Sequence, residues 1–220
     1  MRSPSEESST RALWPVAVFT AAYLIVAVVV AHQRGNAEFL MYVGVVVVLA
    51  AAIGLVHFQV RLLPAALWCL SLWGLLHMAG GLLILPDSWP ADAAPDHPAV
   101  LYGLWLIPQR LRYDHVIHAY GFGVTTWICW QGLRAAIARR GKIDRQNVRP
   151  TFGLLTLAAA AGLGFGALNE VVEFAATLLV PETNVGGYVN TGWDLVANTV
   201  GSLLAAGAIV LHDRTRTAQP

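Results

Sequence analysis

The chain has 220 residues, of which 56% are hydrophobic and only 12% are charged, and its formal net charge is +1. Water-soluble domains carry about 25% charged residues, so the composition excludes an ordinary soluble domain and predicts a membrane protein in contact with lipids. The charge balance gives no indication of nucleic-acid binding, and no nucleic acid is expected among the partners.

Six apolar stretches are long enough to cross a bilayer. A helix needs about 20 mainly apolar residues to cross the hydrocarbon core, and the stretches that qualify are residues 13–31, 39–58, 62–85, 113–133, 152–180 and 192–211. We therefore predict an all-α polytopic transmembrane helix bundle of about six spans. It forms a single domain over residues 13–211, between an N-terminal tail (1–12) and a C-terminal tail (212–220).

The connections between these stretches have the composition of loops. Residues 86–98 contain four prolines and three aspartates, and residues 181–191 are also rich in turn-forming residues. A short apolar piece at 99–107 is too short to span a membrane, so we expect an interfacial or re-entrant segment there. Within the fifth stretch, Gly162, Gly164 and Gly166 predict a close approach between helices.

Lysine and arginine are distributed unequally between the two predicted sides. With six spans and the N-terminus inside, the inner connections and tails hold eleven of these residues, and the outer ones hold three, Arg34, Arg110 and Arg112. Positive residues concentrate on the cytoplasmic side of membrane proteins. Both termini are therefore predicted to be cytoplasmic, and the proline-rich loop is predicted to face outward.

Acidic residues stand inside the apolar stretches. No Lys or Arg lies at similar depth, and an ionised side chain within a span costs about 3 kcal/mol or more, so each acid needs a compensating partner. The predicted topology places four acids near the outer side, in one layer with histidines and asparagines: Asp114, Glu170, Glu173, Asp194, His77, His115, His118, Asn169 and Asn198.

Helical spacing gives these residues common faces. Residues three or four apart lie on the same side of a helix. This rule pairs Asp114 with His118 in the fourth span, and Asp194 with Asn198 in the sixth. In the fifth span it places Asn169 and Glu170 with Glu173. We expect the three faces to meet inside the bundle, because lipid is a poor neighbour for them.

Four kinds of role are compatible with such a cluster. Imidazole and carboxylate groups are ligands for Zn, Mn or Fe, and carboxylate pairs three residues apart occur in di-metal sites of helix bundles. The same groups are also suited to acid–base catalysis without a metal, with a histidine oriented by a carboxylate. In a transporter they form a proton relay. Alternatively, they hydrogen-bond to one another and serve only helix packing.

Two arginines flank the cluster on the predicted outer side. Arg110 and Arg112 precede the fourth span. Two guanidinium groups can bind a phosphate in a bidentate manner. The alternative is that they anchor the fourth span at the lipid headgroups.

The motifs in this cluster resemble those of YjdF-like bacterial inner-membrane proteins and, more distantly, of VanZ-like proteins. The resemblance rests on residues 77–81, on 112–118 with 121–122, on 169–170 with 173–174, and on the segment DLVANTVG at 194–201. It implies a polytopic helical fold in the bacterial cytoplasmic (inner) membrane and little defined biochemistry. An arginine that VanZ-like chains tend to place before the final aspartate is missing here.

The leading hypothesis is a metal-dependent enzyme that acts on a lipid-linked or envelope substrate. Its metal ligands are predicted to be His77, His118 and Asp194, its catalytic acids Asp114, Glu170 and Glu173, and its substrate contacts Arg110, Arg112, Asn169 and Asn198. The alternatives are a non-enzymatic protein of envelope maintenance and a proton-coupled carrier. The inner halves of the third to sixth spans hold hardly any ionisable residues, which disfavours a carrier.

Overall fold

Six long helices make up most of the described chain, and the all-α prediction is confirmed. The structure is a computed structural model that describes residues 4–93, 97–181 and 183–217, with side chains from residue 13 to residue 216. The helices are α1 (Pro4–Gln33), α2 (Ala37–Val60), α3 (Pro64–Leu82), α4 (Tyr113–Gly141), α5 (Phe152–Leu179) and α6 (Tyr188–Thr217). Residues 1–3 and 218–220 of the predicted tails, and 94–96 and 182 of the predicted loops, lie outside the described residues.

Local capping makes several helices differ in length from the apolar stretches. α2 begins after Asn36, whose side chain accepts a hydrogen bond of 2.9 Å from the N–H of Phe39. It ends where Arg61 adopts a left-handed conformation with φ 57°. α1 and α6 run into the predicted tails, and α4 continues to Gly141 although the basic composition after residue 138 predicts a connection.

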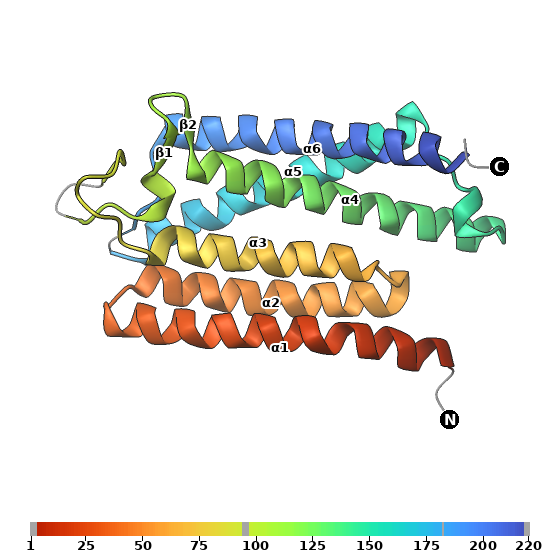
Figure 1. Ribbon diagram of the computed structural model, residues 1–220, viewed down its shortest axis with the longest axis horizontal. Coiled ribbons are helices and arrows are strands. Elements are labelled where there is room, and N and C mark those ends of the chain that lie inside the picture. Colours follow the sequence, from red (N-terminus) through yellow and green to blue (C-terminus); the bar gives the residue numbers. More distant parts are fainter. Residues whose placement is uncertain (1–3, 94–96, 182, 218–220) are drawn as a thin grey trace.

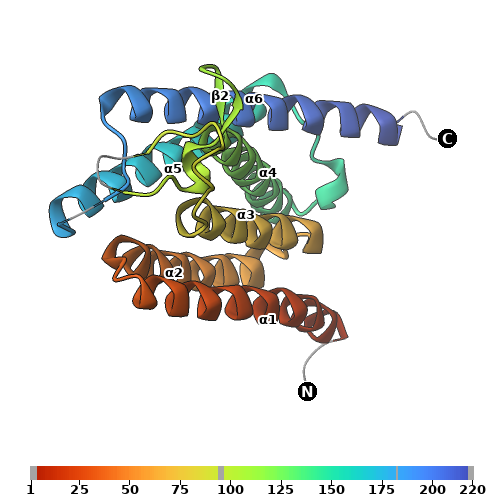
Figure 2. The same cartoon turned by 60° about the vertical axis from the view of Figure 1, so that its left-hand side comes forward.

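The helices form two groups of three (Figures 1 and 2). α1, α2 and α3 pack against one another, α4, α5 and α6 form the second group, and α3 joins the groups by packing on α4. Both termini lie at one end of the bundle, here called the terminal end. The opposite end, here called the loop end, holds the described parts of three connections, residues 34–36, 83–93 with 97–112, and 180–181 with 183–187 (Figure 1).

α4 is the most polar of the long helices. Within the described residues, α1, α2, α3, α5 and α6 are long and apolar enough to cross a membrane, whereas α4 does not meet that criterion. α4 packs against α3, α5 and α6, so the other helices cover much of its surface and it needs fewer apolar side chains. The remaining helices expose large apolar side chains, as lipid contact requires, among them Ile25, Val48, Leu55, Leu178 and Leu204.

The connection between α3 and α4 folds as an extended cap over the loop end. Leu85 donates to the carbonyl of Ala99 at 2.8 Å, and Leu101 donates to that of Leu83 at 3.0 Å. The short 3₁₀ helix η1 (Leu101–Gly103) follows, and then the antiparallel strands β1 (Trp105–Ile107) and β2 (Leu111–Arg112). The apolar piece predicted at 99–107 thus forms part of this cap, which leads directly into α4 (Figure 1).

Glycines bring the backbones of α4, α5 and α6 close together. A Cβ atom on Gly201 of α6 would overlap the backbone carbonyl of Ala119 in α4, and one on Gly166 of α5 would lie 2.8 Å from Nδ2 of Asn198. Gly162 is similarly close to Thr126, whereas Gly164 has no such neighbour. This close packing allows the short polar side chains of α6 to reach α4.

Candidate functional site

His118 occupies the centre of a polar cluster at the loop end. It lies on α4 and is buried. Its Nδ1 lies 3.1 Å from Oδ1 of Asn198 on α6, and because this oxygen can only accept a hydrogen bond, the imidazole proton belongs on Nδ1. The unprotonated Nε2 then faces Oδ1 of Asp114 at 3.6 Å and Oε1 of Glu173 at 3.9 Å. A histidine held in this tautomer is ready to bind a metal ion.

Two groups of side chains that share His118 have the spacing of metal ligands. In the first, called the Asp194 group, one ligand atom from each of Asp114, His118 and Asp194 lies within 4.8 Å of the others. In the second, called the Glu170 group, the same holds for His118, Glu170 and Glu173. Two ligands of one zinc ion lie at most about 4.4 Å apart. Small side-chain movements therefore suffice to bring either group to metal-binding distance.

Two acids of the cluster keep buried oxygens without a hydrogen-bond partner among the described residues, although Oε1 of Glu170 lies 3.7 Å from Nδ1 of His118. Both carboxylate oxygens of Glu170 and Oδ1 of Asp194 have no hydrogen-bond partner among the described residues. Asp194 is 0% exposed and the side chain of Glu170 is 9% exposed, so water has little access to them. Buried polar atoms nearly always have a partner in native proteins. The cluster therefore has a place for a partner that the described side chains do not supply.

Two further asparagines orient the acids. Nδ2 of Asn169 donates to Oε1 of Glu173 at 2.8 Å, and Nδ2 of Asn190 donates to Oδ2 of Asp194 at 2.6 Å. Arg112 in turn donates to Oδ1 of Asn190. Because a guanidinium group can only donate, the amide of Asn190 must turn its oxygen to Arg112 and its nitrogen to Asp194. Asp194 is thus held through one oxygen, and its other oxygen stays available.

The two arginines predicted at the substrate have different surroundings. Arg112 is half-buried, and its Nε lies 3.4 Å from Nε2 of His115 while its guanidinium lies 3.9 Å from Asp92 and 5.7 Å from the ring centre of Trp105. Arg110 is exposed in the turn between β1 and β2. The structure therefore brings Arg112 to the edge of the cluster and leaves Arg110 at the surface of the cap.

A cavity of about 240 Å³ reaches the cluster from the loop end. Asp114 and Glu173 line it, as do Arg112 and Asn190. Its remaining walls come from α2, α3, η1 and the connections, and include Phe39, Tyr42, His77, Tyr102 and Val185. This volume is at the small end for ligand pockets. It fits a polar headgroup better than a whole lipid.

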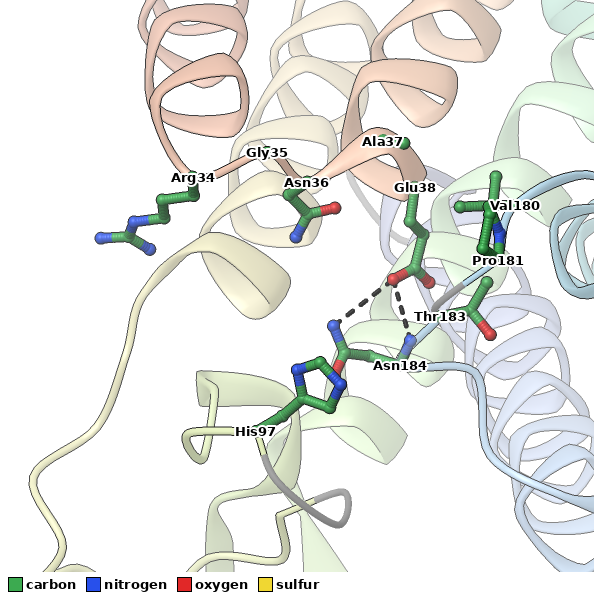
Figure 3. Close-up of a pocket in the computed structure, with 10 residues that line it drawn as sticks. All are labelled: Arg34, Gly35, Asn36, Ala37, Glu38, His97, Val180, Pro181, Thr183 and Asn184. Atoms are coloured by element: carbon green, nitrogen blue, oxygen red, sulfur yellow. Dashed lines mark hydrogen bonds between the residues drawn. The ribbon is translucent and has the colours of Figure 1, made fainter.

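A second cavity of about 290 Å³ adjoins the first at the turn between α1 and α2 (Figure 3). Glu38, Thr183 and Asn184 line both cavities. The backbone N–H of Asn184 donates to Oε2 of Glu38 at 2.9 Å, and its side-chain amide donates to the same oxygen at 3.4 Å. Glu38 thereby ties the connection between α5 and α6 to α2, and the pair forms a wall between the cavities.

His77 lies beside the same cavity but in neither ligand group. Its Nδ1 is hydrogen-bonded to the hydroxyl of Tyr102, which also donates to the carbonyl of His77 at 3.0 Å. Its ring packs against Phe39 and Tyr42, with centroid distances of 6.3 and 5.8 Å. Burial raises the pKa of Tyr102 well above its ordinary value of 10, so this hydroxyl stays protonated. The structure thus brings His118 together with Asp194 and leaves His77 in an aromatic pocket.

The sequence analysis did not identify three residues that lie near the site. Asn190 stands four residues before Asp194, so its helical spacing was a usable indication. Glu38 lies one residue before the predicted second span, where an acid after a helix cap is ordinary. Tyr102 lies in a connection without helical period, and no sequence pattern places it against His77.

Comparison with known proteins places the chain in a family. No curated protein and no solved structure matches it. One family model, described as "Predicted membrane protein (DUF2238)", matches residues 13–215. That range includes the whole cluster around His118. The chain therefore belongs to the DUF2238 family of predicted membrane proteins.

Proposed function

We propose that this chain is a metal-dependent enzyme of the bacterial inner membrane that hydrolyses a bond in the headgroup of a lipid-linked substrate. The observation that carries the proposal is the cluster around His118, where acids from three helices meet one imidazole and two of them keep unpartnered buried oxygens. A divalent cation supplies the positive charge that these acids need. Imidazole and carboxylate ligands suit Zn²⁺, Mn²⁺ or Fe²⁺.

The roles of the residues follow from their positions. His118 through Nε2, Asp114 and Asp194 would hold the cation, which would lower the pKa of a bound water. Glu173 lines the cavity and is held by Asn169, so it is placed to act as the general base. In the hydrolysis, the water oxygen bonds to the attacked atom of the headgroup while Glu173 takes the water proton. The bond from that atom to the leaving oxygen breaks, and Glu173 returns the proton to the leaving oxygen. Asn169 and Asn198 act here by orienting Glu173 and His118.

The location of the cavity supports a lipid-linked substrate. The cavity opens at the loop end among helices whose outer faces are apolar, so a lipid tail can stay in the bilayer while its headgroup enters. The excess of Lys and Arg in the connections and tails of the terminal end supports a cytoplasmic position for that end. The YjdF-like resemblance supports a location in the bacterial inner membrane. The VanZ-like resemblance of residues 194–201 stays a prediction.

A proton-coupled carrier is the weaker alternative. Ser202 of α6 and Thr126 of α4 continue the polar face below Asn198, and their buried hydroxyls have no hydrogen-bond partner among the described residues. Toward the terminal end, however, an apolar core that includes Ile128 and Ala135 follows. Between them lies the buried amide of Gln131, which accepts from the N–H of Leu63 at 2.8 Å. An amide does not ionise, so a relay of ionisable groups does not continue there, which favours a closed site.

Elemental analysis tests the metal. The full chain is purified in detergent, freed of metal with a chelator, and reconstituted with Zn²⁺, Mn²⁺ or Fe²⁺. At least one ion per chain is expected, and Asp194→Asn is expected to bind one ion fewer than the wild type. Asp213→Asn is the matched control, because Asp213 lies on the same helix but pairs with Arg149 at 3.1 Å at the terminal end. Failure of the wild-type chain to retain any of the three metals contradicts the proposal.

An activity assay tests the reaction. Reconstituted protein is incubated with mixed micelles of a bacterial lipid extract, and released water-soluble headgroups are identified by mass spectrometry. Glu173→Gln is expected to bind metal and to slow release by about 10²-fold or more, the usual contribution of a general base. Equal release by the wild type and by this variant refutes the role of Glu173.

A further inference from the structure

The two ligand groups at the candidate site have different acids. The Asp194 group takes its carboxylates from α4 and α6, and the Glu170 group takes both of its carboxylates from α5. His118 is the one residue that the groups share. Because Nδ1 of His118 is engaged by Asn198, one imidazole nitrogen is available, and it lies nearer to Asp114, at 3.6 Å, than to Glu173, at 3.9 Å. The shared histidine can therefore serve the Asp194 group, and the Glu170 group is left with oxygen ligands.

Each group has its own unpartnered buried oxygens. Oδ1 of Asp194 belongs to the first group, and both oxygens of Glu170 belong to the second. One ion in the Asp194 group leaves the carboxylate of Glu170 buried without a hydrogen-bond partner among the described residues, with Nδ1 of His118 at 3.7 Å. One ion in the Glu170 group leaves Oδ1 of Asp194 in the same condition. A single cation thus satisfies only half of the cluster.

The charge of the cluster also indicates that one divalent cation is too few. Asp114, Glu170, Glu173 and Asp194 carry four negative charges when ionised. The adjacent cation, Arg112, lies 3.9 Å from Asp92 outside the cluster and reaches Asp194 only through Asn190. Two divalent cations supply four positive charges, which balance the four acids.

We propose that the cluster binds two divalent cations. The first is held by Asp114, Asp194 and Nε2 of His118, and the second by Glu170 directly and by Glu173 through a bound water, which is the water that Glu173 deprotonates. The first set, with its nitrogen ligand, suits Zn²⁺, Mn²⁺ or Fe²⁺, and the second, with oxygen alone, suits a harder ion such as Mn²⁺ or Mg²⁺. A pair of ions about 3.5–4 Å apart stabilises both the attacking and the leaving oxygen of a displacement. This inference rests on the proposed function, since it requires that the cluster hold metal.

Manganese is the probe that reports both stoichiometry and proximity. Metal-free full chain in detergent is titrated with Mn²⁺, bound metal is measured by elemental analysis, and the bound form is recorded by low-temperature electron paramagnetic resonance. We expect two Mn²⁺ per chain and a spin-coupled spectrum. A saturating value of one Mn²⁺ with an uncoupled spectrum overturns the two-cation inference and leaves the proposed function standing. A value of zero for Mn²⁺ and for Zn²⁺ and Fe²⁺ contradicts both.

Single substitutions assign the two ions. Glu170→Gln and Asp194→Asn are each expected to bind one Mn²⁺ per chain with an uncoupled spectrum, whereas Asp213→Asn is expected to keep two. Both amides nearly preserve side-chain shape and remove a buried charge, and circular dichroism with size-exclusion elution checks that the helices are intact. Retention of two coupled ions in Glu170→Gln overturns the assignment of the second ion. The wild-type titration tests the stoichiometry even if a variant does not fold.

Discussion

Charged side chains at the two ends of the bundle differ in their hydrogen-bond partners. At the terminal end, arginines donate to carbonyls within the chain: Arg145 donates to those of Val60 and Arg61 where α2 ends, and Arg134 donates through Nη2 to that of Arg145 at 2.8 Å, although its Nε has no hydrogen-bond partner among the described residues. Cations near the last carbonyls of a helix are electrostatically favourable. At the loop end, acids gather around one histidine, and Glu170 and Asp194 keep buried oxygens without a described partner.

This contrast distinguishes charged side chains that serve packing from the acids of the cluster around His118. Where a charged group serves packing, as Arg145 does, the chain supplies the complementary atom. The cluster around His118 brings four acids into one buried place, and that arrangement is unfavourable unless protons or metal cations neutralise the acids. The predictions below remove one member of each arrangement, beginning with the largest expected effect.

Removing one acid of the cluster is expected to have the largest effect on metal affinity. Asp194→Asn should weaken binding of the first ion by more than the 10–100-fold typical of outer-shell changes, because a ligand itself is lost. In the metal-free state the same change should raise the thermal midpoint, since it removes a buried like charge. Isothermal titration with Mn²⁺ and thermal unfolding in detergent measure the two effects. A lower midpoint in the metal-free variant would show that the acids already have partners within the chain.

Separating α4 from α6 is expected to disrupt the cluster through the backbone. Gly201→Ala places a Cβ against the backbone carbonyl of Ala119, which cannot move aside cheaply, so we expect a loss of about 3 kcal/mol in the free energy of unfolding together with weaker metal binding. Gly207→Ala is the control on the same helix, because a Cβ there has no neighbour within 4 Å. Denaturant unfolding followed by tryptophan fluorescence distinguishes the two variants.

Removing Asn190, which lies between Arg112 and Asp194, is expected to have an intermediate effect on metal affinity. Asn190→Ala leaves every ligand in place but frees Oδ2 of Asp194, which now accepts at 2.6 Å. Metal affinity should fall about 10–100-fold, with no change in the number of ions at saturation. A matched control is Asn147→Ala in the short helix η2 (Arg145–Asn147) at the terminal end. An unchanged affinity in Asn190→Ala would refute its orienting role.

His77 offers a test of which histidine binds metal. Its Nδ1 is engaged by Tyr102 and it lies in neither ligand group, so His77→Gln should keep the wild-type metal content and lose about 1 kcal/mol of stability through the lost hydrogen bond. His118→Gln, in contrast, should lose the first ion. Elemental analysis of both variants decides between them, and loss of metal in His77→Gln would restore His77 as a ligand.

A charge pair at the terminal end is expected to have the smallest effect. Arg149 and Asp213 lie 3.1 Å apart with side chains 54% and 30% exposed, and exposed pairs contribute about 0–1 kcal/mol. Arg149→Gln should therefore shift the unfolding free energy by less than about 1 kcal/mol and leave metal content unchanged. A change in metal content would show that the two ends are coupled.

Much of the candidate site follows from periodicity within single helices. The spacing from Asp114 to His118, from Glu170 to Glu173 and from Asp194 to Asn198 gives each helix a polar face, and these faces do meet. His77 shows the limit of such reasoning. It lies at the depth that its position in α3 predicts, yet Tyr102 from the connection engages its ring, and no helical pattern places a loop residue.

The sequence by itself determined the membrane class, the order of the helices and the residues of the acidic layer. Apolar length and helical period are local properties, and the cost of charge in a span forces polar faces inward whatever the packing. Tertiary structure alone decided that His118 and not His77 joins the acids, that Arg112 acts through Asn190, and that α4 lies among the other helices. Those outcomes depend on which backbones approach closely, as at Gly201, and on how the α3–α4 connection folds over the loop end.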